Sequence, residues 1–220
     1  MESYDMTLLT PSKWIIFGSS GSGKTSFVLK LLEFQNEMFN KTFDRIIYFY
    51  GQTEPDVKFH NLKNIEIING LNIDEDYLNS FDKNLNNVII LDDLMNEIGN
   101  DKVIANLFSK FSRHRNITVF LLLQNIFPKG KFFTDFFRNA NYLVLMKNPL
   151  GMSQIRLLET RIFGNNSNFL KDAYIDSTKE NPFSYLLIDS IQTTPENLRV
   201  RTKIFPDDNN HIIYVQKNLK

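Results

Sequence analysis

The chain has 220 residues, of which 42% are hydrophobic and 23% are charged, with 25 basic and 25 acidic side chains. This is the composition of an ordinary globular protein, and the length suits one domain covering residues 1–220. A net charge of zero gives no overall attraction to nucleic acid or membrane, so any DNA contact must come from local basic patches. The absence of cysteine excludes disulfides and thiolate metal sites.

The N-terminal residues and the length of the apolar runs indicate whether the protein is secreted or inserted in a membrane. The first ten residues, MESYDMTLLT, are polar and acidic and lack the pattern of a secretory signal. The longest apolar run, Ile117–Leu123, is too short to span a bilayer. We therefore expect an intracellular protein without a membrane partner.

Apolar runs alternate with helical stretches along residues 11–150, which predicts βαβ units and a mostly parallel central sheet. The runs are almost continuously apolar, as is typical of strands buried on both faces. Between residues 51 and 87 a long polar connection carries one short strand near Ile65–Ile68 and is interpreted as an insertion. In chain order the main predictions are strand Lys13–Gly18, helix Lys24–Phe39, strands Arg45–Tyr50 and Val88–Asp92, helix Asp101–Arg113, strand Ile117–Leu123, helix Phe132–Asn139 and strand Tyr142–Lys147.

The pattern is weaker after Pro149, where a helix near Ser153–Phe163 precedes two β-like runs, Phe183–Ile188 and Leu198–Ile204. No Pro/Gly/Ser-rich linker separates this part from the rest. We therefore interpret residues 151–220 as a small C-terminal β extension of the same domain.

A phosphate-binding loop follows the first predicted strand. Residues 18–25, GSSGSGKT, match the pattern G-x-x-x-x-G-K-[ST], with an apolar strand before the loop and an amphipathic helix after it. Backbone N–H groups of such a loop surround phosphate oxygens, and the helix N-terminus adds positive partial charge. The predicted nucleotide-binding residues are Gly18, Ser19, Ser20, Gly21, Ser22, Gly23, Lys24, Thr25 and Ser26.

Two of these residues have specific predicted roles. Lys24 is expected to reach the β- and γ-phosphates of ATP, and the Thr25 hydroxyl to bind Mg²⁺. The alternative, a Gly/Ser loop that arises by chance, does not explain why a strand and a helix flank it in the expected order. The cofactors predicted from this loop are therefore ATP and Mg²⁺.

Two carboxylates, Asp92 and Asp93, follow the apolar run Val88–Leu91. A buried parallel strand delivers such side chains to the carboxyl edge of the sheet, where ligands bind. Asp92 is the predicted second Mg²⁺ ligand, and Asp93 is the predicted residue that polarises the attacking water. Because many ATPases of this kind carry Glu at the second position, Glu97 stays open as an alternative base. The alternative to a catalytic role is that Asp92 and Asp93 only cap the turn that follows the strand.

A polar amide, Gln124, ends the next strand and is the predicted contact to the γ-phosphate or the lytic water. Its neighbour Asn125 also ends this strand, but a role in the following turn is an alternative for it, so Gln124 is the preferred sensor. An acidic strand followed by a strand with a polar end indicates a three-layer α/β fold of the additional-strand, RecA-like class of P-loop NTPases. Base-reading motifs of the Asn-Lys-x-Asp type, typical of GTPases, are absent from the sequence.

With these residues in place, the sequence resembles the FtsK/HerA-type genome-packaging ATPases of double-stranded DNA viruses, and most of all those of Maverick/Polinton elements and adintoviruses. The resemblance covers most of the chain in family order. One departure is Leu150, where the family usually carries Arg after Lys-Asn-Pro. The matching stretches are IIFGSSGSGKTSFV, RIIYFYGQTEPD, VIILDDLMNEI, SRHRNITVFLLLQNIF, NYLVLMKNP, SQI and LRVRTKIFPD.

The resemblance implies a motor that forms a pentameric or hexameric ring and pumps double-stranded DNA into a preformed capsid. Its partners would be DNA, capsid or procapsid vertex proteins and further copies of itself. It would act inside an infected host cell, in the nucleus or at a viral assembly site, and transiently on the capsid. Two alternatives stay open: a helicase or DNA-transport ATPase, and a nucleotide-binding assembly scaffold without turnover.

Basic residues supply candidates for contacts between subunits and with DNA. In ring ATPases an Arg from a neighbour stabilises the γ-phosphate charge, and Arg113 or Arg115 is the predicted source, with Arg138 as a weaker candidate. A solvated helix end is the equal alternative. The candidate DNA contacts are Lys129 and Lys131 in the loop after Gln124, and Arg199, Arg201 and Lys203, which would share one face of a strand, although a solvated face is as good an explanation.

Overall fold

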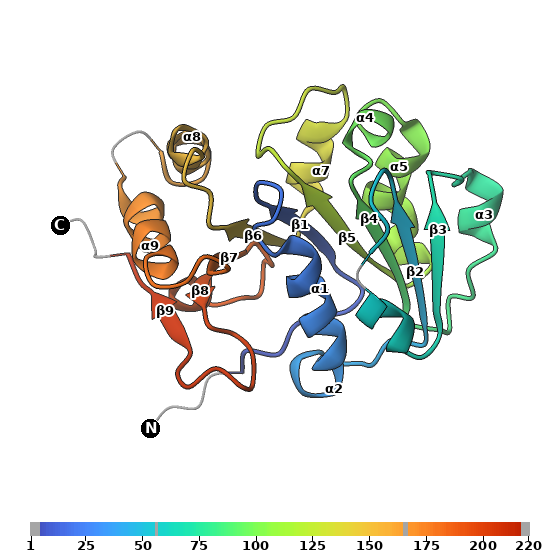
Figure 1. The fold of residues 1–220 in the computed structure, drawn as a ribbon, viewed down its shortest axis with the longest axis horizontal. Coiled ribbons are helices and arrows are strands. Elements are labelled where there is room, and N and C mark those ends of the chain that lie inside the picture. The colour runs from blue at the N-terminus through green and yellow to red at the C-terminus, as the bar shows by residue number, and fades with distance from the viewer. Residues whose placement is uncertain (1–4, 56, 165–166, 217–220) are drawn as a thin grey trace.

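The structure is a computed structural model, and it describes residues 5–55, 57–164 and 167–216. One sheet runs through the molecule in the order β3-β2-β4-β5-β1-β6-β7-β8-β9, from right to left in Figure 1. Neighbouring strands are parallel from β3 to β6 and antiparallel from β6 to β9. The strands are β1 (Lys13–Phe17), β2 (Arg45–Tyr50), β3 (Ile65–Asn69), β4 (Asn87–Asp92), β5 (Ile117–Leu123), β6 (Tyr142–Met146), β7 (Tyr185–Asp189), β8 (Val200–Thr202) and β9 (Ile212–Tyr214).

Helical segments cover both faces of the sheet, which makes three layers (Figure 1). One face packs against α1 (Lys24–Glu33), α2 (Gln35–Met38) and the 3₁₀ turn η1 (Val57–Asn61). The other face carries α3 (Glu75–Asn79), α4 (Met95–Ile98), α5 (Lys102–Asn106), the π-helical turn η2 (Leu107–Phe111), α6 (Ser112–His114), α7 (Phe133–Asn139), α8 (Met152–Phe163) and α9 (Phe169–Thr178). A further 3₁₀ turn, η3 (Glu196–Leu198), precedes β8.

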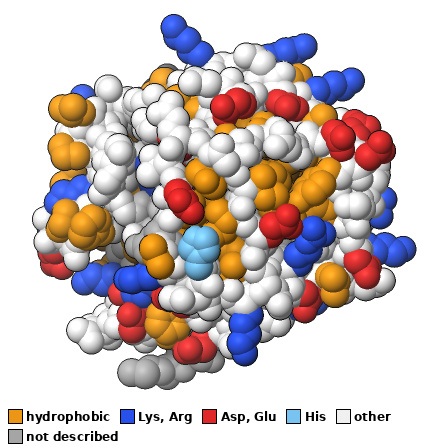
Figure 2. All heavy atoms as spheres, turned by 45° about the vertical axis from the view of Figure 1, so that its right-hand side comes forward, with side chains coloured by type: hydrophobic (Ala, Val, Ile, Leu, Met, Phe, Trp, Pro, Cys, Tyr) orange, Lys and Arg blue, Asp and Glu red, His pale blue; other side chains and the backbone are white. Residues whose placement is uncertain are grey.

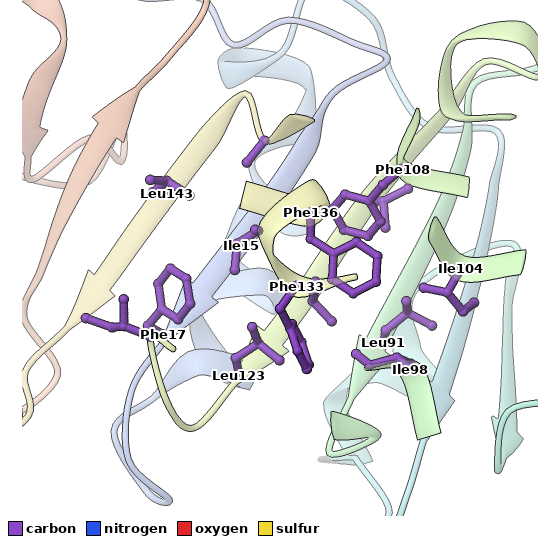
Figure 3. Packing of buried hydrophobic residues seen from close by; sticks show 14 of the residues in the cluster. Ile15, Phe17, Leu91, Ile98, Ile104, Phe108, Leu123, Phe133, Phe136 and Leu143 are labelled. Carbon is purple, nitrogen blue, oxygen red and sulfur yellow. The ribbon is translucent and has the colours of Figure 1, made fainter. Parts of the chain in front are cut away.

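The alternation of side chains along the strands explains why two hydrophobic cores form. In β4, Ile89 and Leu91 belong to the core under α3–α9, whereas Val88 and Ile90 belong to the core under α1. Successive side chains of a strand point to opposite faces, so a continuously apolar strand supplies both layers. Figure 3 shows the first core from close by, with Phe133, Phe136, Phe108, Leu123 and Leu91 among its packed side chains.

The predicted elements are confirmed in type, with differences at their ends. The helix expected over Lys24–Phe39 is divided, since α1 ends before Phe34 and α2 follows it. The helix expected over Asp101–Arg113 contains the π-helical turn η2 between α5 and α6, and the Asp101 side chain caps its start. The apolar pattern does not predict α3, α4, α9 or β9, because these elements are short or have little periodicity.

Among the residues that the structure describes, the outer strand β3 pairs only with β2. Figure 2 turns this side of the molecule forward and shows a patch of hydrophobic side chains with acidic side chains around it. On β3 itself Ile65, Ile67 and Ile68 are half-buried and Glu66 is exposed. Charged residues on an outer strand discourage uncontrolled pairing with other chains. Within the described ranges, no helix is long and apolar enough to cross a membrane.

Candidate nucleotide site

The phosphate loop joins the end of β1 to the start of α1. Gly21 and Gly23 adopt left-handed backbone conformations, with φ of 74° and 93°, and Gly23 is the residue that precedes the first helical turn. A side chain at either position would be strained, which explains the glycines of the motif. The turn is closed by the Ser22 N–H, which donates to the Ser19 carbonyl at 3.2 Å.

Packing explains the first glycine of the loop. A Cβ atom at Gly18 would lie 2.2 Å from Ser22 Oγ and 2.7 Å from Met146 Cβ, so a larger residue does not fit. Ser22 Oγ is buried and has no hydrogen-bond partner among the described residues. Gly18 also continues the sheet, since its N–H donates to the Leu123 carbonyl at 3.1 Å. The loop is therefore fixed at its base to β5.

The helix α1 begins without a side-chain cap and without an acidic residue in its first turn. The first N–H groups of a helix have no partner within the helix, and the helix dipole adds positive partial charge there. Ser20, Gly21, Lys24, Thr25 and Ser26 line a cavity of about 720 Å³ at this position. An uncapped helix start that faces a cavity is suited to bind phosphate groups.

Lys24 is largely buried at the base of the loop. Its Nζ donates to the carbonyls of Gly18 at 2.8 Å and Ser19 at 3.0 Å. Burial lowers the pKa of Lys24, while the negative charges of Asp92 and Asp93 act in the opposite direction. The ammonium group is thus held against the loop, within the electrostatic influence of Asp92 and Asp93, where it can neutralise phosphate charge.

The predicted metal ligands lie side by side. The Thr25 hydroxyl donates a hydrogen bond to Asp92 Oδ2 at 2.9 Å, from α1 to the end of β4. The same Oδ2 accepts a second hydrogen bond from the Tyr48 hydroxyl of β2 at 2.5 Å. Burial, followed by the charge of Asp92, raises the pKa of Tyr48, so Tyr48 stays a protonated donor. Thr25 and Asp92 therefore offer two oxygen atoms to one ion, with Tyr48 fixing the carboxylate.

Asp93 has an unusual backbone. Its φ of 56° is in the left-handed region, which Asp tolerates better than most residues. This conformation brings the Asp93 carbonyl against Gly51, where a Cβ atom would lie only 2.1 Å from it. On its side chain, Asp93 Oδ1 accepts a hydrogen bond of 3.3 Å from Gln124 Nε2. The predicted base and the predicted sensor are therefore in direct contact.

Both proposed bases line the 720 Å³ cavity together with the loop. Glu97 is exposed on α4, whereas Asp93 is half-buried beside Gln124. Hydroxyl and carboxylate oxygens are the ligands that Mg²⁺ prefers, and Mg²⁺ usually takes one or two carboxylates together with substrate phosphates. Thr25 and Asp92 fit this pattern, and the described part of the chain holds no cluster of three or more His, Asp or Glu suited to another metal.

The structure places Arg113 and Arg115 away from this cavity. Both precede β5, at the amino edge of the sheet, where burial and then the charge of Arg113 lower the pKa of Lys13, the first residue of β1. The seven residues of β5 span roughly 23 Å, so neither arginine serves the site of its own subunit. Arg113 is exposed, and Arg115 is half-buried and donates to Asn79 Oδ1 at 2.9 Å. Their role in a neighbouring subunit stays a prediction.

The loop with Lys129 and Lys131 is exposed on the side of α4. It is attached to the residues that follow this helix. The Phe132 N–H donates to the Gly99 carbonyl and the Lys131 N–H donates to Asn100 Oδ1, each at 3.1 Å. A short segment, Asp93–Asn100, thus connects the candidate base to the candidate DNA-contact loop.

The prediction that Arg199, Arg201 and Lys203 share one exposed strand face is wrong. The strand β8 is only Val200–Thr202, because Leu198 belongs to η3 and Lys203 has a left-handed φ of 54°. Arg201 is 3% exposed, and its guanidinium forms an ion pair of 2.8 Å with buried Asp189. Buried Arg201 leaves no surface for DNA.

The other two side chains of this group are accessible but have acidic partners. Arg199 pairs with Glu196 at 2.9 Å and also donates to the carbonyls of Asp189 and Ile191. Lys203 pairs with Glu180 at 3.5 Å. Both interactions lower the positive charge that these side chains present to a DNA backbone.

Comparisons with known proteins give matches in structure alone. No protein-family model matches the sequence, and no curated protein does either. The genome packaging NTPase B204 from Sulfolobus turreted icosahedral virus 2, in complex with sulfate, is similar with a TM-score of 0.55 and 12% identity over 87% of this chain and 95% of that chain.

Two further similar structures are larger proteins. EssC (ATPases 2 and 3) from Geobacillus thermodenitrificans has a TM-score of 0.54 at 11% identity, over 95% of this chain and 41% of that chain. The cytoplasmic domain of the type VII secretion ATPase EccC from Thermomonospora curvata has a TM-score of 0.52 at 13% identity, over 86% of this chain and 25% of that chain. The chain has the fold of the additional-strand P-loop NTPases. The strand β5 lies between the acidic strand β4 and the phosphate-loop strand β1, as this class requires, and at these identities the likeness shows the fold alone.

Two residues of the site were not singled out in the sequence. Tyr48 stands within the apolar run of β2, and the available signal is that a tyrosine in a buried strand needs a partner for its hydroxyl. Gly51 directly follows β2, at the same edge as Asp92, and a glycine at a strand end is a signal of close backbone approach.

Proposed function

We propose that this protein hydrolyses ATP with Mg²⁺ at the phosphate loop and uses the energy to move double-stranded DNA into a preformed capsid. The observation that supports ATP hydrolysis is the 2.9 Å hydrogen bond between Thr25 and Asp92. Both residues line the same cavity as Lys24, Asp93 and Gln124. These are the side chains that phosphoryl transfer to water needs, gathered from three separate segments of the chain.

The residues divide the reaction between them. A water oxygen attacks the γ-phosphorus, the bond to the β-phosphate oxygen breaks, and the water proton passes to a carboxylate. Asp93 is the proposed acceptor of that proton, because Gln124 contacts it and can orient the same water. Lys24 and the N–H groups at the start of α1 stabilise the charge that develops on the phosphate oxygens. Thr25 and Asp92 would hold Mg²⁺, which would supply further positive charge to stabilise the phosphate oxygens.

The DNA-packaging role rests on the sequence motifs and on the kind of protein with the same fold. The sequence resembles the packaging ATPases of Maverick/Polinton elements and adintoviruses, and B204 is a genome packaging NTPase. We propose a ring of five or six subunits, with DNA and a capsid vertex as partners, in an infected host cell. Arg113 or Arg115 would reach the active site of the adjacent subunit, and Lys129 and Lys131 would contact DNA phosphates.

The test is ATP hydrolysis by the purified protein with and without double-stranded DNA, with Lys24→Ala as the control. We expect turnover that DNA stimulates and that Lys24→Ala abolishes. Stimulation by single strands or forks together with strand displacement would instead identify a helicase. ATP binding without turnover would identify a scaffold, and turnover that does not respond to any DNA would contradict a packaging motor.

A further inference from the structure

A second cavity, of about 570 Å³, opens on the other side of the start of α1. Gly23 and Ser26 form its wall toward the phosphate loop, and Tyr185, Lys203 and Asp208 come from the C-terminal strands and loops. Ser26 also lines the 720 Å³ cavity that holds Thr25 and Asp92. The two cavities therefore lie on either side of Ser26 in the first turn of α1, where a ligand with its phosphates in one can extend past Ser26 toward the other.

An exposed aromatic ring stands at the entrance of this second cavity. Phe183 is 60% exposed, although it is a large apolar side chain. Its backbone N–H donates to Asn181 Oδ1 at 2.8 Å, which fixes the turn before β7. In this position Phe183 Cδ1 lies 3.2 Å from the place that a Cβ atom of Gly23 would occupy. An accessible ring held beside a phosphate loop offers a flat apolar surface on which a nucleobase can stack.

The charges around the cavity favour a neutral ligand part over a second phosphate group. Two lysines, Lys30 and Lys203, and two carboxylates, Glu180 and Asp208, line it, so its charges balance, and Lys203 pairs with Glu180 at 3.5 Å. Carboxylates repel phosphate and accept hydrogen bonds from hydroxyl and amino groups. A ribose and a purine carry such donors, whereas the triphosphate does not.

We propose that the second cavity is the nucleoside subsite and that Phe183 stacks on the base of the bound nucleotide. This inference rests on the proposed function, because it assumes that a triphosphate occupies the loop from Gly18 to Thr25. It also gives Lys203 a place beside the nucleoside instead of on DNA. The region after residue 150 thereby becomes part of the nucleotide site.

The experiment compares two ligands on the same variants by calorimetry: ATP with Mg²⁺, and inorganic tripolyphosphate with Mg²⁺, which lacks the nucleoside. Phe183→Ala should weaken ATP binding by roughly 5- to 150-fold, the range expected for the loss of one stacked base. It should leave tripolyphosphate binding unchanged. Phe183→Trp, which keeps a flat ring, should bind ATP about as well as the wild type. Leu157→Ala removes another exposed apolar side chain, 45% exposed on α8, and serves as the control.

The outcomes separate the two proposals. Unchanged ATP binding by Phe183→Ala overturns the nucleoside subsite and leaves the phosphate loop intact. Equal weakening of both ligands also overturns it, because Phe183 would then act on the loop. A wild-type protein that binds neither ligand refutes nucleotide binding itself.

Discussion

The Tyr48 hydroxyl of β2 and the Thr25 hydroxyl of α1 both donate to Oδ2 of Asp92. Tyr48 is fully buried, and its ring packs edge-on against Phe59 with ring centroids 4.9 Å apart. The two hydrogen bonds therefore fix the orientation of the carboxylate. Residues that orient a metal ligand in this way commonly affect metal affinity 10- to 100-fold.

We predict that Tyr48→Phe raises the Mg²⁺ concentration needed for half-maximal ATP hydrolysis by about 10- to 100-fold, while kcat at saturating Mg²⁺ changes less. The reason is that the phenyl ring stays in place and only the hydrogen bond to Asp92 is lost. Tyr50→Phe, two residues further along β2, is the matched control. An unchanged Mg²⁺ dependence with lower thermal stability would show that the hydroxyl has only a structural role.

Replacing each candidate carboxylate, Asp93 and Glu97, by the amide of the same shape identifies the general base. We expect Asp93→Asn to lower kcat by about 10²- to 10⁴-fold, the usual contribution of a general base, and Glu97→Gln to change it only a few-fold. Asn tolerates the left-handed backbone at position 93, so the turn against Gly51 is kept. Steady-state hydrolysis at saturating ATP is the measurement. The reverse order of effects would assign the base to Glu97.

The hydrogen bond that Asn100 accepts from Lys131 predicts that basal ATP hydrolysis and its stimulation by DNA can be affected separately. Asn100 Oδ1 accepts the Lys131 N–H at 3.1 Å and so joins the candidate DNA-contact loop to the segment that begins at Asp93. Asn100→Ala should keep the basal hydrolysis rate and reduce the stimulation by DNA roughly 2- to 30-fold. Asn139→Ala, at the far end of α7, is the control, since its side chain bonds within its own helix. Equal loss of basal and stimulated rates would argue against this connection.

The ion pair between Arg201 and Asp189 predicts an effect on stability. Burial raises the pKa of Asp189 in the fold, whereas the Ile191 N–H and the charge of Arg201 act to lower it. Arg201→Met leaves this buried carboxylate without its partner, which should reduce the free energy of unfolding by about 3–5 kcal/mol. Arg138→Ala, whose pair with Asp135 is exposed, should cost about 1 kcal/mol or less.

Urea denaturation of both variants measures the difference. The double variant Arg201→Met/Asp189→Leu should recover part of the loss, because it removes both charges from the buried site. An Arg201→Met protein as stable as the wild type, with weaker DNA affinity, would restore Arg201 to the DNA-contact candidates.

Mixtures of two variant subunits test the proposal that Arg113 or Arg115 acts on a neighbouring subunit in a ring. Subunits with Arg113→Ala and Arg115→Ala keep their phosphate loop, and Lys24→Ala subunits keep both arginines. Each parent ring should lose activity, by roughly 10³- to 10⁵-fold for the arginine variant. Mixtures should recover a measurable fraction, because an intact loop can then meet an intact arginine from its neighbour. Rings that assemble normally and recover nothing would exclude this role.

The sequence alone determined the parts of the site that lie close together in the chain. The loop Gly18–Thr25 and the pair Asp92–Asp93 are local patterns, because a glycine-rich turn between a strand and a helix, and carboxylates at a strand end, are read from neighbouring residues. The parallel strands of the core also follow from their continuous apolar runs. The fold class could therefore be predicted before the structure.

Only the tertiary structure decided the contacts between distant segments. Tyr48 reaches Asp92 because β2 pairs with β4, and Arg201 is buried because β7 pairs with β8. Neither strand pairing can be predicted from the local sequence. The position of Phe183 beside Gly23 joins residues 160 positions apart. Such contacts depend on strand order and register, which are set by the packing of the whole sheet and not by any local pattern.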